Sequence, residues 1–291
     1  MTFLSYAQNF EDVMLWRALK HIPAGFYIDV GAMDPEEDSV TRAFYERGWH
    51  GINIEPSPEH FARFSARQRD VNLQVALGDA ASRRTLFVIP GTGLSTLNDK
   101  VANAHNIRGY AGRETLVEVT TLAGVCQQYA QGDIHFLKID VEGAEQEVLA
   151  GADFSAYRPW IVVVEATRPM SQEQEYAGWE PMLLDAGYKF VWFDGLNRFY
   201  LAAERYEELK RHFQVPPNIF DGFAQVAGAL MAERIEHAQL IARTAETRAR
   251  EMEAQSRASE ELVASMRATL SWRLTAPFRS IGGYFQRFKR K

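Results

Sequence analysis

Four acidic residues stand at or near the ends of apolar segments that are typical of buried strands. They are Asp29, Glu55, Asp140 and Glu165, which close the runs 26–29, 51–55, 134–140 and 160–165. The carboxyl ends of parallel strands meet at one edge of a sheet, and open α/β sheets bind their ligands at that edge. Capping of the following helix could explain one or two of these acids. All four together predict a polar site along one edge of the sheet.

The spacing of two of these acids indicates a nucleoside-type cofactor. Gly31 follows Asp29 closely and lets the backbone turn sharply and approach a ligand with no Cβ in the way. Glu55 stands 26 residues after Asp29, near the spacing at which nucleotide-binding folds place a carboxylate on a ribose hydroxyl. Two carboxylates beside one glycine turn favour a cofactor with a ribose and a positively charged group. S-adenosylmethionine has both.

Length and composition indicate a globular protein. The chain has 291 residues, 46% hydrophobic residues and six Trp, which suits one large α/β domain with an appendage, or two domains. The single cysteine, Cys126, excludes an internal disulfide framework and indicates a reducing compartment. We expect neither a signal peptide nor a membrane-spanning helix, because no long uninterrupted apolar run occurs. The expected location is cytoplasmic, or peripheral on the inner face of the cell membrane.

The charge is unevenly distributed along the chain. The net charge is −6, but residues 271–291 contain six cations and no acid, so the remaining chain carries −12. The negative charge of residues 1–270 argues against nucleic acid as the main partner.

The order of predicted elements is that of an α/β protein. Apolar runs predict parallel strands at 26–30, 49–55, 71–77, 134–140 and 160–165, with further strands at 84–89, 117–120, 188–193 and 199–202. Helices are predicted at about 10–20, 39–48, 56–64, 122–129, 144–149 and 179–186. Asp194-Gly195 favours a hairpin between the last two strands. The segment 90–114 has no firm periodicity, and we expect it to form a lid.

Several motifs resemble those of one methyltransferase family. They are 7–12 (Ala-Gln-Asn-Phe-Glu-Asp), 29–32 (Asp-Val-Gly-Ala), Glu55, Gly78-Asp79, 93–96 (Gly-Leu-Ser-Thr), 137–145 (Leu-Lys-Ile-Asp-Val-Glu-Gly-Ala-Glu), 158–160 (Arg-Pro-Trp) and 194–200 (Asp-Gly-Leu-Asn-Arg-Phe-Tyr). On these residues the chain resembles the FkbM family of S-adenosylmethionine-dependent methyltransferases from about Tyr6 to Phe223. The turn after Gly31 departs from the family pattern, because Met33 and Pro35 stand where a further glycine or Asn is usual.

The resemblance implies a fold and an activity. The fold is that of a class I methyltransferase, a Rossmann-like sheet of seven strands in the order 3-2-1-4-5-7-6 with strand 7 antiparallel. The activity is O-methylation, and we expect the acceptor to be a hydroxyl of a sugar or glycan, in the biosynthesis of a bacterial surface polysaccharide. We assign residues 1–224 to the methyltransferase domain, 225–270 to a long helix and 271–291 to a basic tail.

The resemblance also implies roles for the motif residues in binding S-adenosylmethionine. The residues expected to contact the cofactor are Asp29, Gly31, Ala32 and Asp140 near the methionine end, Glu55 at the ribose, Ala76, Gly78 and Asp79 at the adenine, and in addition Gln8, Asp12 and Ser95. A hydroxyl must lose its proton to become a good nucleophile, so we expect a general base.

The candidates for the base are the acids at the centre of the sheet. Asp140 is favoured because it ends the central strand, with Glu165 and Glu142 as alternatives. His135 lies within a strand, which favours packing over catalysis. The clustered carboxylates could instead hold a divalent metal that lowers the pKa of the hydroxyl. The sequence leaves a metal open, because it lacks a His-rich ligand pattern.

The C-terminal part has two distinct patterns. From Met231 to Leu270 a seam of mostly Ala, Ser and Met repeats with heptad spacing, which predicts either a coiled coil between copies of the chain or a lone solvated helix. In 271–291 an apolar stripe with Phe278 and Tyr284 runs among the six cations. This pattern favours an amphipathic helix on a membrane surface, with docking on another protein as the alternative.

Two other functions stay open. A nicotinamide-dependent oxidoreductase would suit the spacing from Asp29 to Glu55, but the chain lacks the Gly-x-Gly-x-x-Gly turn that a pyrophosphate needs. A non-catalytic scaffold would act through the C-terminal helix and tail alone.

Overall fold

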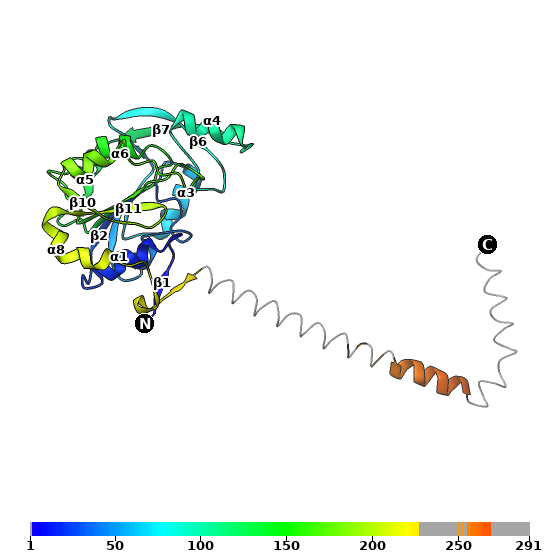
Figure 1. Cartoon of the computed structure of the whole chain (residues 1–291). Helices are drawn as coiled ribbons and strands as arrows, with labels where there is room; N and C mark the ends of the chain where they lie inside the picture. Colours follow the sequence, from blue (N-terminus) through cyan, green and yellow to red (C-terminus); the bar gives the residue numbers. More distant parts are fainter. Residues whose placement is uncertain (1, 227–249, 251, 253–254, 256, 269–291) are drawn as a thin grey trace. The chain divides into compact units, whose positions relative to one another are not determined.

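A computed structural model describes residues 2–226, 250, 252, 255 and 257–268 (Figure 1). The chain divides into two compact units, Met1–Ala227 and Gly228–Lys291. In the second unit residues 257–268 are helical. The predicted heptad seam lies mainly outside the described residues and the tail 271–291 entirely so; both stay predictions. No helix in the described part of the chain is long and apolar enough to cross a membrane.

The first unit is built on a seven-stranded sheet. Its strands, in spatial order, are β4 (Val71–Leu73), β3 (His50–Ile54), β2 (Phe26–Val30), β8 (Phe136–Ile139), β9 (Ile161–Glu165), β11 (Asn197–Ala202) and β10 (Tyr188–Phe193). Neighbouring strands are parallel from β4 to β9, and β11 is antiparallel to both of its neighbours. Numbered along the chain, this order is 3-2-1-4-5-7-6. It is the arrangement that the family resemblance implies.

Helices cover both faces of this sheet. They are α1 (Glu11–Leu19), α2 (Arg42–Tyr45), α3 (Pro58–Phe61), α5 (Leu122–Tyr129), α6 (Glu145–Ala150), α7 (Glu180–Asp185) and α8 (Tyr206–Leu209), with 3₁₀ turns at Ala62–Ala66, Ala203–Arg205, Lys210–Phe213 and Ile219–Asp221. Alternate side chains of a strand point to opposite faces. Accordingly Ile28 packs in one core with residues of α5, α6 and α7, while Tyr27 packs in a second core with residues of α1, α2 and α8.

A smaller sheet stands beside the large one and differs from the prediction. It consists of β5 (Ala76–Leu77), β7 (Arg113–Thr120) and β6 (Ser82–Val88), in that order. The prediction of one strand over 71–77 was therefore wrong. The chain leaves the large sheet after Leu73, and Ala76 pairs with Val119 of β7 instead.

The segment 90–114, which is predicted to form a lid, contains a helix that the sequence pattern did not indicate. It contains α4 (Asp99–Ile107), whose N-cap is Asn98, and Figure 1 shows this helix beside β6 and β7. The side-chain Oδ1 of Asn98 accepts hydrogen bonds from the backbone N–H groups of Lys100 and Val101, at 3.0 and 3.4 Å. Thr96 forms a bridge with Phe87 of β6, which fixes the start of the segment.

A last pair of strands joins the two ends of the first unit. These are β1 (Phe3–Ser5) and β12 (Phe223–Gln225), which pair in parallel. The short strands lie far apart in the sequence, and no local pattern indicated them.

Candidate active site

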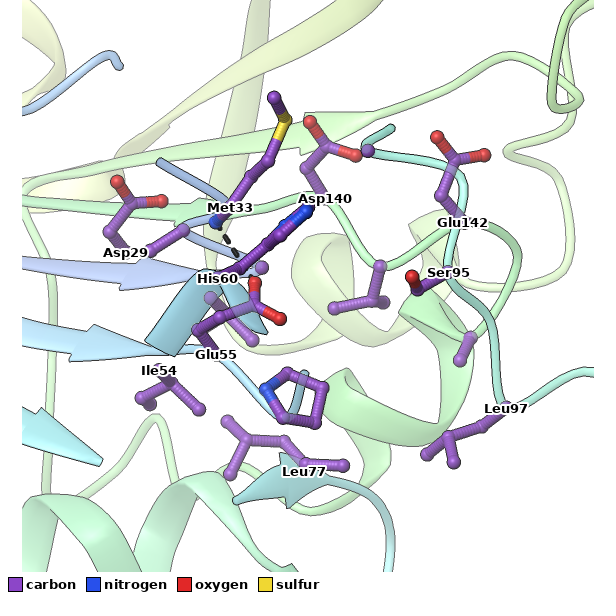
Figure 2. Close-up of a pocket in the computed structure, with 18 of the residues that line it drawn as sticks. Asp29, Met33, Ile54, Glu55, His60, Leu77, Ser95, Leu97, Asp140 and Glu142 are labelled. Atoms are coloured by element: carbon purple, nitrogen blue, oxygen red, sulfur yellow. Dashed lines mark hydrogen bonds between the residues drawn. The ribbon is translucent and has the colours of Figure 1, made fainter. Parts of the chain in front are cut away.

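A cavity of about 230 Å³ opens at the carboxyl ends of β2, β3 and β8 (Figure 2). One wall carries carboxyl groups, including those of Asp140 and Glu142, and the opposite wall is apolar, with Ile54, Leu77 and Leu97. The cavity therefore lies at the predicted edge of the sheet and offers two chemically different ends.

The turn after β2 forms the floor of this cavity. Gly31 has φ +74°, and the N–H groups of Gly31 and Ala32 donate to the carbonyl oxygen of Ile54 at 3.0 and 3.1 Å. A Cβ on Gly31 would lie 1.8 Å from the carbonyl oxygen of Asp140. Only glycine lets the ends of β2 and β8 approach this closely.

Glu55, which follows β3, holds the next part of the floor. Its Oε2 accepts a hydrogen bond from the N–H of Met33 at 2.9 Å, and its Oε1 accepts one from the N–H of Ser57 at 2.8 Å. The side chain is 6% exposed, and burial raises its pKa to about 7. Each carboxylate oxygen can still accept a second hydrogen bond from a ligand hydroxyl.

Lys138 of β8 connects two acids beneath the cavity. Its Nζ lies 3.2 Å from Oδ2 of Asp140 and 3.5 Å from Oδ1 of Asp29, and it donates to the carbonyl oxygen of Gly31 at 3.1 Å. Burial lowers the pKa of this ammonium, but the charges of Asp140 and Asp29 outweigh burial and raise it. Lys138 therefore stays charged and fixes both acids.

The loop after β8 is held from both sides. Oε1 of Glu145 accepts hydrogen bonds from the N–H groups of Val141 and Gly143, at 3.2 and 3.1 Å. Thr96 donates through its hydroxyl to the carbonyl oxygen of Glu142 at 2.8 Å. Glu142 itself has φ +53°, a left-handed conformation that costs a residue with a Cβ about 1–2 kcal/mol. The motif 137–145 thus builds a tight turn that presents acids at the cavity.

Three of the predicted acids meet at this turn. Asp140, Glu142 and Glu165 each offer a carboxylate oxygen within 4.8 Å of the others. Burial, followed by the charges of Asp140 and Glu142, raises the pKa of Glu165 to about 11, and burial with Asp140 raises that of Glu142 to about 8. Asp140 and Glu142 line the cavity, and Glu165 completes the group from the end of β9. We call these three residues the carboxylate cluster.

Most residues predicted to contact the cofactor also line the cavity. These are Gln8, Asp29, Gly31, Ala32, Glu55, Ala76, Ser95 and Asp140. Gly78 and Asp79 are not in the lining; Gly78 donates its N–H to the carbonyl oxygen of Thr120 in the small sheet, and Asp79 is exposed.

Asp12 has a structural position instead of the predicted one. Its carboxylate is fully buried and accepts hydrogen bonds from the hydroxyl of Ser5 and from the N–H groups of Tyr6 and Ala7, at 2.8, 2.8 and 3.3 Å. Its lone pairs are used within the N-terminal segment, so we no longer assign it to the cofactor.

His135 is packed, as expected. It directly precedes β8, at the end remote from the cavity. Its Nδ1 accepts a hydrogen bond from the N–H of Phe26 at 3.0 Å, and its ring lies against Trp49 and Trp160.

Sequence reasoning gave no role to several residues of the site. Met33, His60 and Leu94 line the cavity, and Lys138 ties its acids together. A charged residue inside the apolar run Phe136–Ile139 was a usable signal, because buried Lys is rare unless it is paired. Met33 and His60 carried no comparable signal.

The Methyltransferase FkbM domain family matches residues 29–190, more than half of the chain. The chain belongs to this family. The match spans the glycine turn, Glu55, the carboxylate cluster and strands β3 to β9, and it supports S-adenosylmethionine as the cofactor.

Solved structures of methyltransferases are similar at low sequence identity. The methyltransferase FkbM from Methylobacillus flagellatus KT is 15% identical with a TM-score of 0.40, over 62% of this chain and 44% of that one. A TehB-like SAM-dependent methyltransferase from Corynebacterium glutamicum is 8% identical with a TM-score of 0.36, over 66% of this chain and 87% of that one. The O-methyltransferase from Bacillus cereus, in complex with SAH, is 10% identical with a TM-score of 0.33, over 68% of this chain and 82% of that one. This chain thus spans less than half of the M. flagellatus protein. No curated protein matches the chain.

The lining of the cavity fits S-adenosylmethionine. Asp29 and Glu55 supply carboxylates for a cationic ligand with ribose hydroxyls, and the apolar wall at Ile54 and Leu77 suits an adenine ring. Within the described residues, the buried hydroxyl of Ser95 has no hydrogen-bond partner, which leaves a polar group for a ligand.

Proposed function

We propose that this FkbM-family protein transfers a methyl group from S-adenosylmethionine to a hydroxyl group of a sugar or glycan. The observation that carries the proposal is that one cavity has two chemically different ends. Glu55 and the apolar wall lie at one end, and Asp140 and Glu142 of the carboxylate cluster lie at the other (Figure 2). A nucleoside fits the first end, and a hydroxyl acceptor fits the second.

Residues at the ends of β2 and β3 would hold the cofactor. Glu55 accepts hydrogen bonds from the ribose hydroxyls, and the aliphatic side chains of Ile54 and Leu77 flank the adenine. Asp29 and the glycine turn lie beside the methionine portion. When bound, the cofactor supplies an activated methyl group on a sulfonium, and displacement from it depends mainly on alignment.

The carboxylate cluster faces the acceptor. Asp140 directly follows the central strand β8 and is oriented by Lys138, which suits it to take the proton of the hydroxyl. Glu142 and Glu165 are the alternatives for this role, since both belong to the same cluster.

The acceptor class rests on the family resemblance and on the site chemistry. An aliphatic or sugar hydroxyl needs a base nearby, whereas the nitrogen of a neutral amine does not. The site provides several carboxylates where the acceptor would enter. A glycan of the cell surface is the acceptor that we propose, with methylation during its biosynthesis in the cytoplasm.

A labelling experiment tests this function. The full chain is incubated with S-adenosylmethionine carrying a labelled methyl group and with a panel of sugar nucleotides and glycans. We expect label in a base-stable methyl ether on a sugar hydroxyl, identified by mass spectrometry. Label on nitrogen or on a carboxylate in place of a hydroxyl would contradict O-methylation. A matched panel of amines is the control for acceptor class.

A further inference from the structure

We propose that the carboxylate cluster of Asp140, Glu142 and Glu165 binds one divalent cation of the Mg²⁺ or Mn²⁺ type. The three residues come from two neighbouring strand ends and the loop between β8 and α6. Each presents a carboxylate oxygen, and the three oxygens lie within 4.8 Å of one another. One ion placed between them can contact all three, since Mg²⁺ and Mn²⁺ prefer oxygen ligands.

An unpartnered buried oxygen points to a ligand independently of this spacing. Glu165 is 8% exposed, and none of the described residues donates a hydrogen bond to its Oε2. Oε2 of Glu142 is likewise buried without a hydrogen-bond partner in the described part of the chain. A buried carboxylate oxygen without a donor is costly unless a cation or a ligand meets it. The two oxygens belong to residues of the same cluster.

The protein itself supplies too little positive charge to the cluster. Lys138 contacts Asp140, but its ammonium is shared with Asp29 and with the carbonyl oxygen of Gly31. Among the described residues no ion pair joins Glu142 or Glu165 to a Lys, Arg or His. Only one of the three carboxyl groups of the cluster therefore has a cationic partner, and a divalent cation would let all three bind it in their ionised form.

The cluster is held in place before any ion binds. The carbonyl oxygen of Glu142 is fixed by the hydroxyl of Thr96, and Glu145 ties the N–H groups on either side of Glu142. Glu165 is the last residue of β9 and pairs with Asn197 of β11. A site built on strand ends and a doubly anchored turn loses little conformational entropy on binding.

The cation gives the acceptor a defined place. Three protein oxygens leave further coordination positions of an octahedral ion for water or for hydroxyls of a sugar. A hydroxyl bound to the ion has a lowered pKa and gives up its proton more readily. This part of the proposal rests on the proposed function, whereas binding of the ion to the cluster does not.

Titration with the metal alone tests the site. Mn²⁺ is added to the full chain after treatment with a chelator and its removal, and free Mn²⁺ is followed by electron paramagnetic resonance. We expect one bound Mn²⁺ per chain, displaced by Mg²⁺. Glu165→Gln and Glu142→Gln keep the shape of each side chain and should each weaken binding at least tenfold. Glu114→Gln, at an exposed acid of β7, is the matched control and should leave the affinity unchanged.

Three outcomes would overturn the proposal. They are no binding of Mn²⁺ to the wild-type chain, equal affinity in both cluster variants and the wild type, and an equal loss in the Glu114→Gln control. Because Glu165→Gln could disturb folding, thermal unfolding is measured for every variant. Glu142→Gln tests the same loss of Mn²⁺ affinity at a half-buried residue. Binding of S-adenosylhomocysteine to the same samples separates the two proposals. If it binds and Mn²⁺ does not, the cation site is wrong and the proposed function stands; the reverse result contradicts the proposed function alone.

Discussion

The ammonium of Lys138 lies 3.2 Å from the carboxylate of Asp140, at the end of the central strand β8. The same ammonium lies 3.5 Å from Asp29 of β2, so one buried cation joins the acids of two neighbouring strands. Both acids line the cavity, and so does Lys138, so the positions of two acids of the site depend on one buried lysine.

Replacement of Lys138 should destabilise the fold. Lys138→Met keeps much of the side-chain volume but leaves two acids without their cation, and breaking a buried ion pair costs about 3–5 kcal/mol. Urea unfolding measures the loss, and Lys20→Met, at an exposed lysine, should change stability by less than about 0.5 kcal/mol. Equal stability of the two variants would contradict the role of Lys138.

Gly31 should tolerate no side chain, because of a backbone contact. Gly31 has φ +74° and Gly91 has φ +70°, so an alanine at either position is similarly strained. A Cβ at Gly31 would collide with the carbonyl oxygen of Asp140, whereas a Cβ at Gly91 would have no atom within 4 Å. We expect Gly91→Ala to cost about 1 kcal/mol and Gly31→Ala several kcal/mol more, measured by urea unfolding. Similar losses would contradict the close approach of β2 and β8.

Stability should depend on pH through Glu11. Its carboxyl group accepts hydrogen bonds from the N–H of Asn9 and the side-chain amide of Asn197, and burial, with the charge of Asp194, raises its pKa to about 7. The folded state thus holds this proton more tightly than the unfolded state does, where the pKa is about 4.5. This contribution to the free energy of unfolding is complete below about pH 4.5 and is lost as the pH rises through 7. The loss amounts to about 3 kcal/mol.

Glu11→Gln removes this titration. The free energy of unfolding of the variant should fall less steeply between pH 5 and 8 than that of the wild type, as measured by urea unfolding at each pH. Glu114→Gln serves as the control and should keep the wild-type slope. A wild-type slope in Glu11→Gln would show that Glu11 is charged in the folded protein at pH 5.

Asp140→Asn should separate turnover from cofactor binding. Asp140 acts on the acceptor hydroxyl, as base or as a ligand of the proposed cation, so turnover should fall roughly 10²-fold or more. The affinity for S-adenosylhomocysteine should change far less, because Glu55 and the apolar wall remain. Initial rates and calorimetry give the two values; near-normal turnover would move the role to Glu165.

Much of the large sheet could be predicted because its signals are local. Each buried strand is an apolar run. The common position of Asp29, Glu55, Asp140 and Glu165 could be predicted because the carboxyl ends of parallel strands lie at one edge of the sheet. The helix at Leu122–Tyr129 was predicted with the correct bounds. The roles predicted for the acids at this edge stay predictions.

The errors come from interactions that a single segment does not show. The apolar run 71–77 predicts one strand, but Ala76 pairs with Val119, so the end of the run belongs to another sheet. The helix at Asp99–Ile107 has few apolar residues, and only its cap at Asn98 marks its start. Asp12 was assigned to the cofactor from the family resemblance. The N–H groups of Tyr6 and Ala7, which donate to its carboxylate, reach it only in the folded N-terminal segment, and the sequence does not show this.

Calorimetric titration of the full chain with S-adenosylhomocysteine tests the central claim, that the cavity between Glu55 and the carboxylate cluster binds the cofactor. We expect one molecule bound per chain, no binding of NAD⁺, and an affinity weakened by about 1–3 kcal/mol in Glu55→Ala. Glu59→Ala, at a neighbouring exposed acid, should bind as the wild type does. The account would be contradicted by absent binding of S-adenosylhomocysteine, by comparable binding of NAD⁺, or by an unchanged affinity in Glu55→Ala.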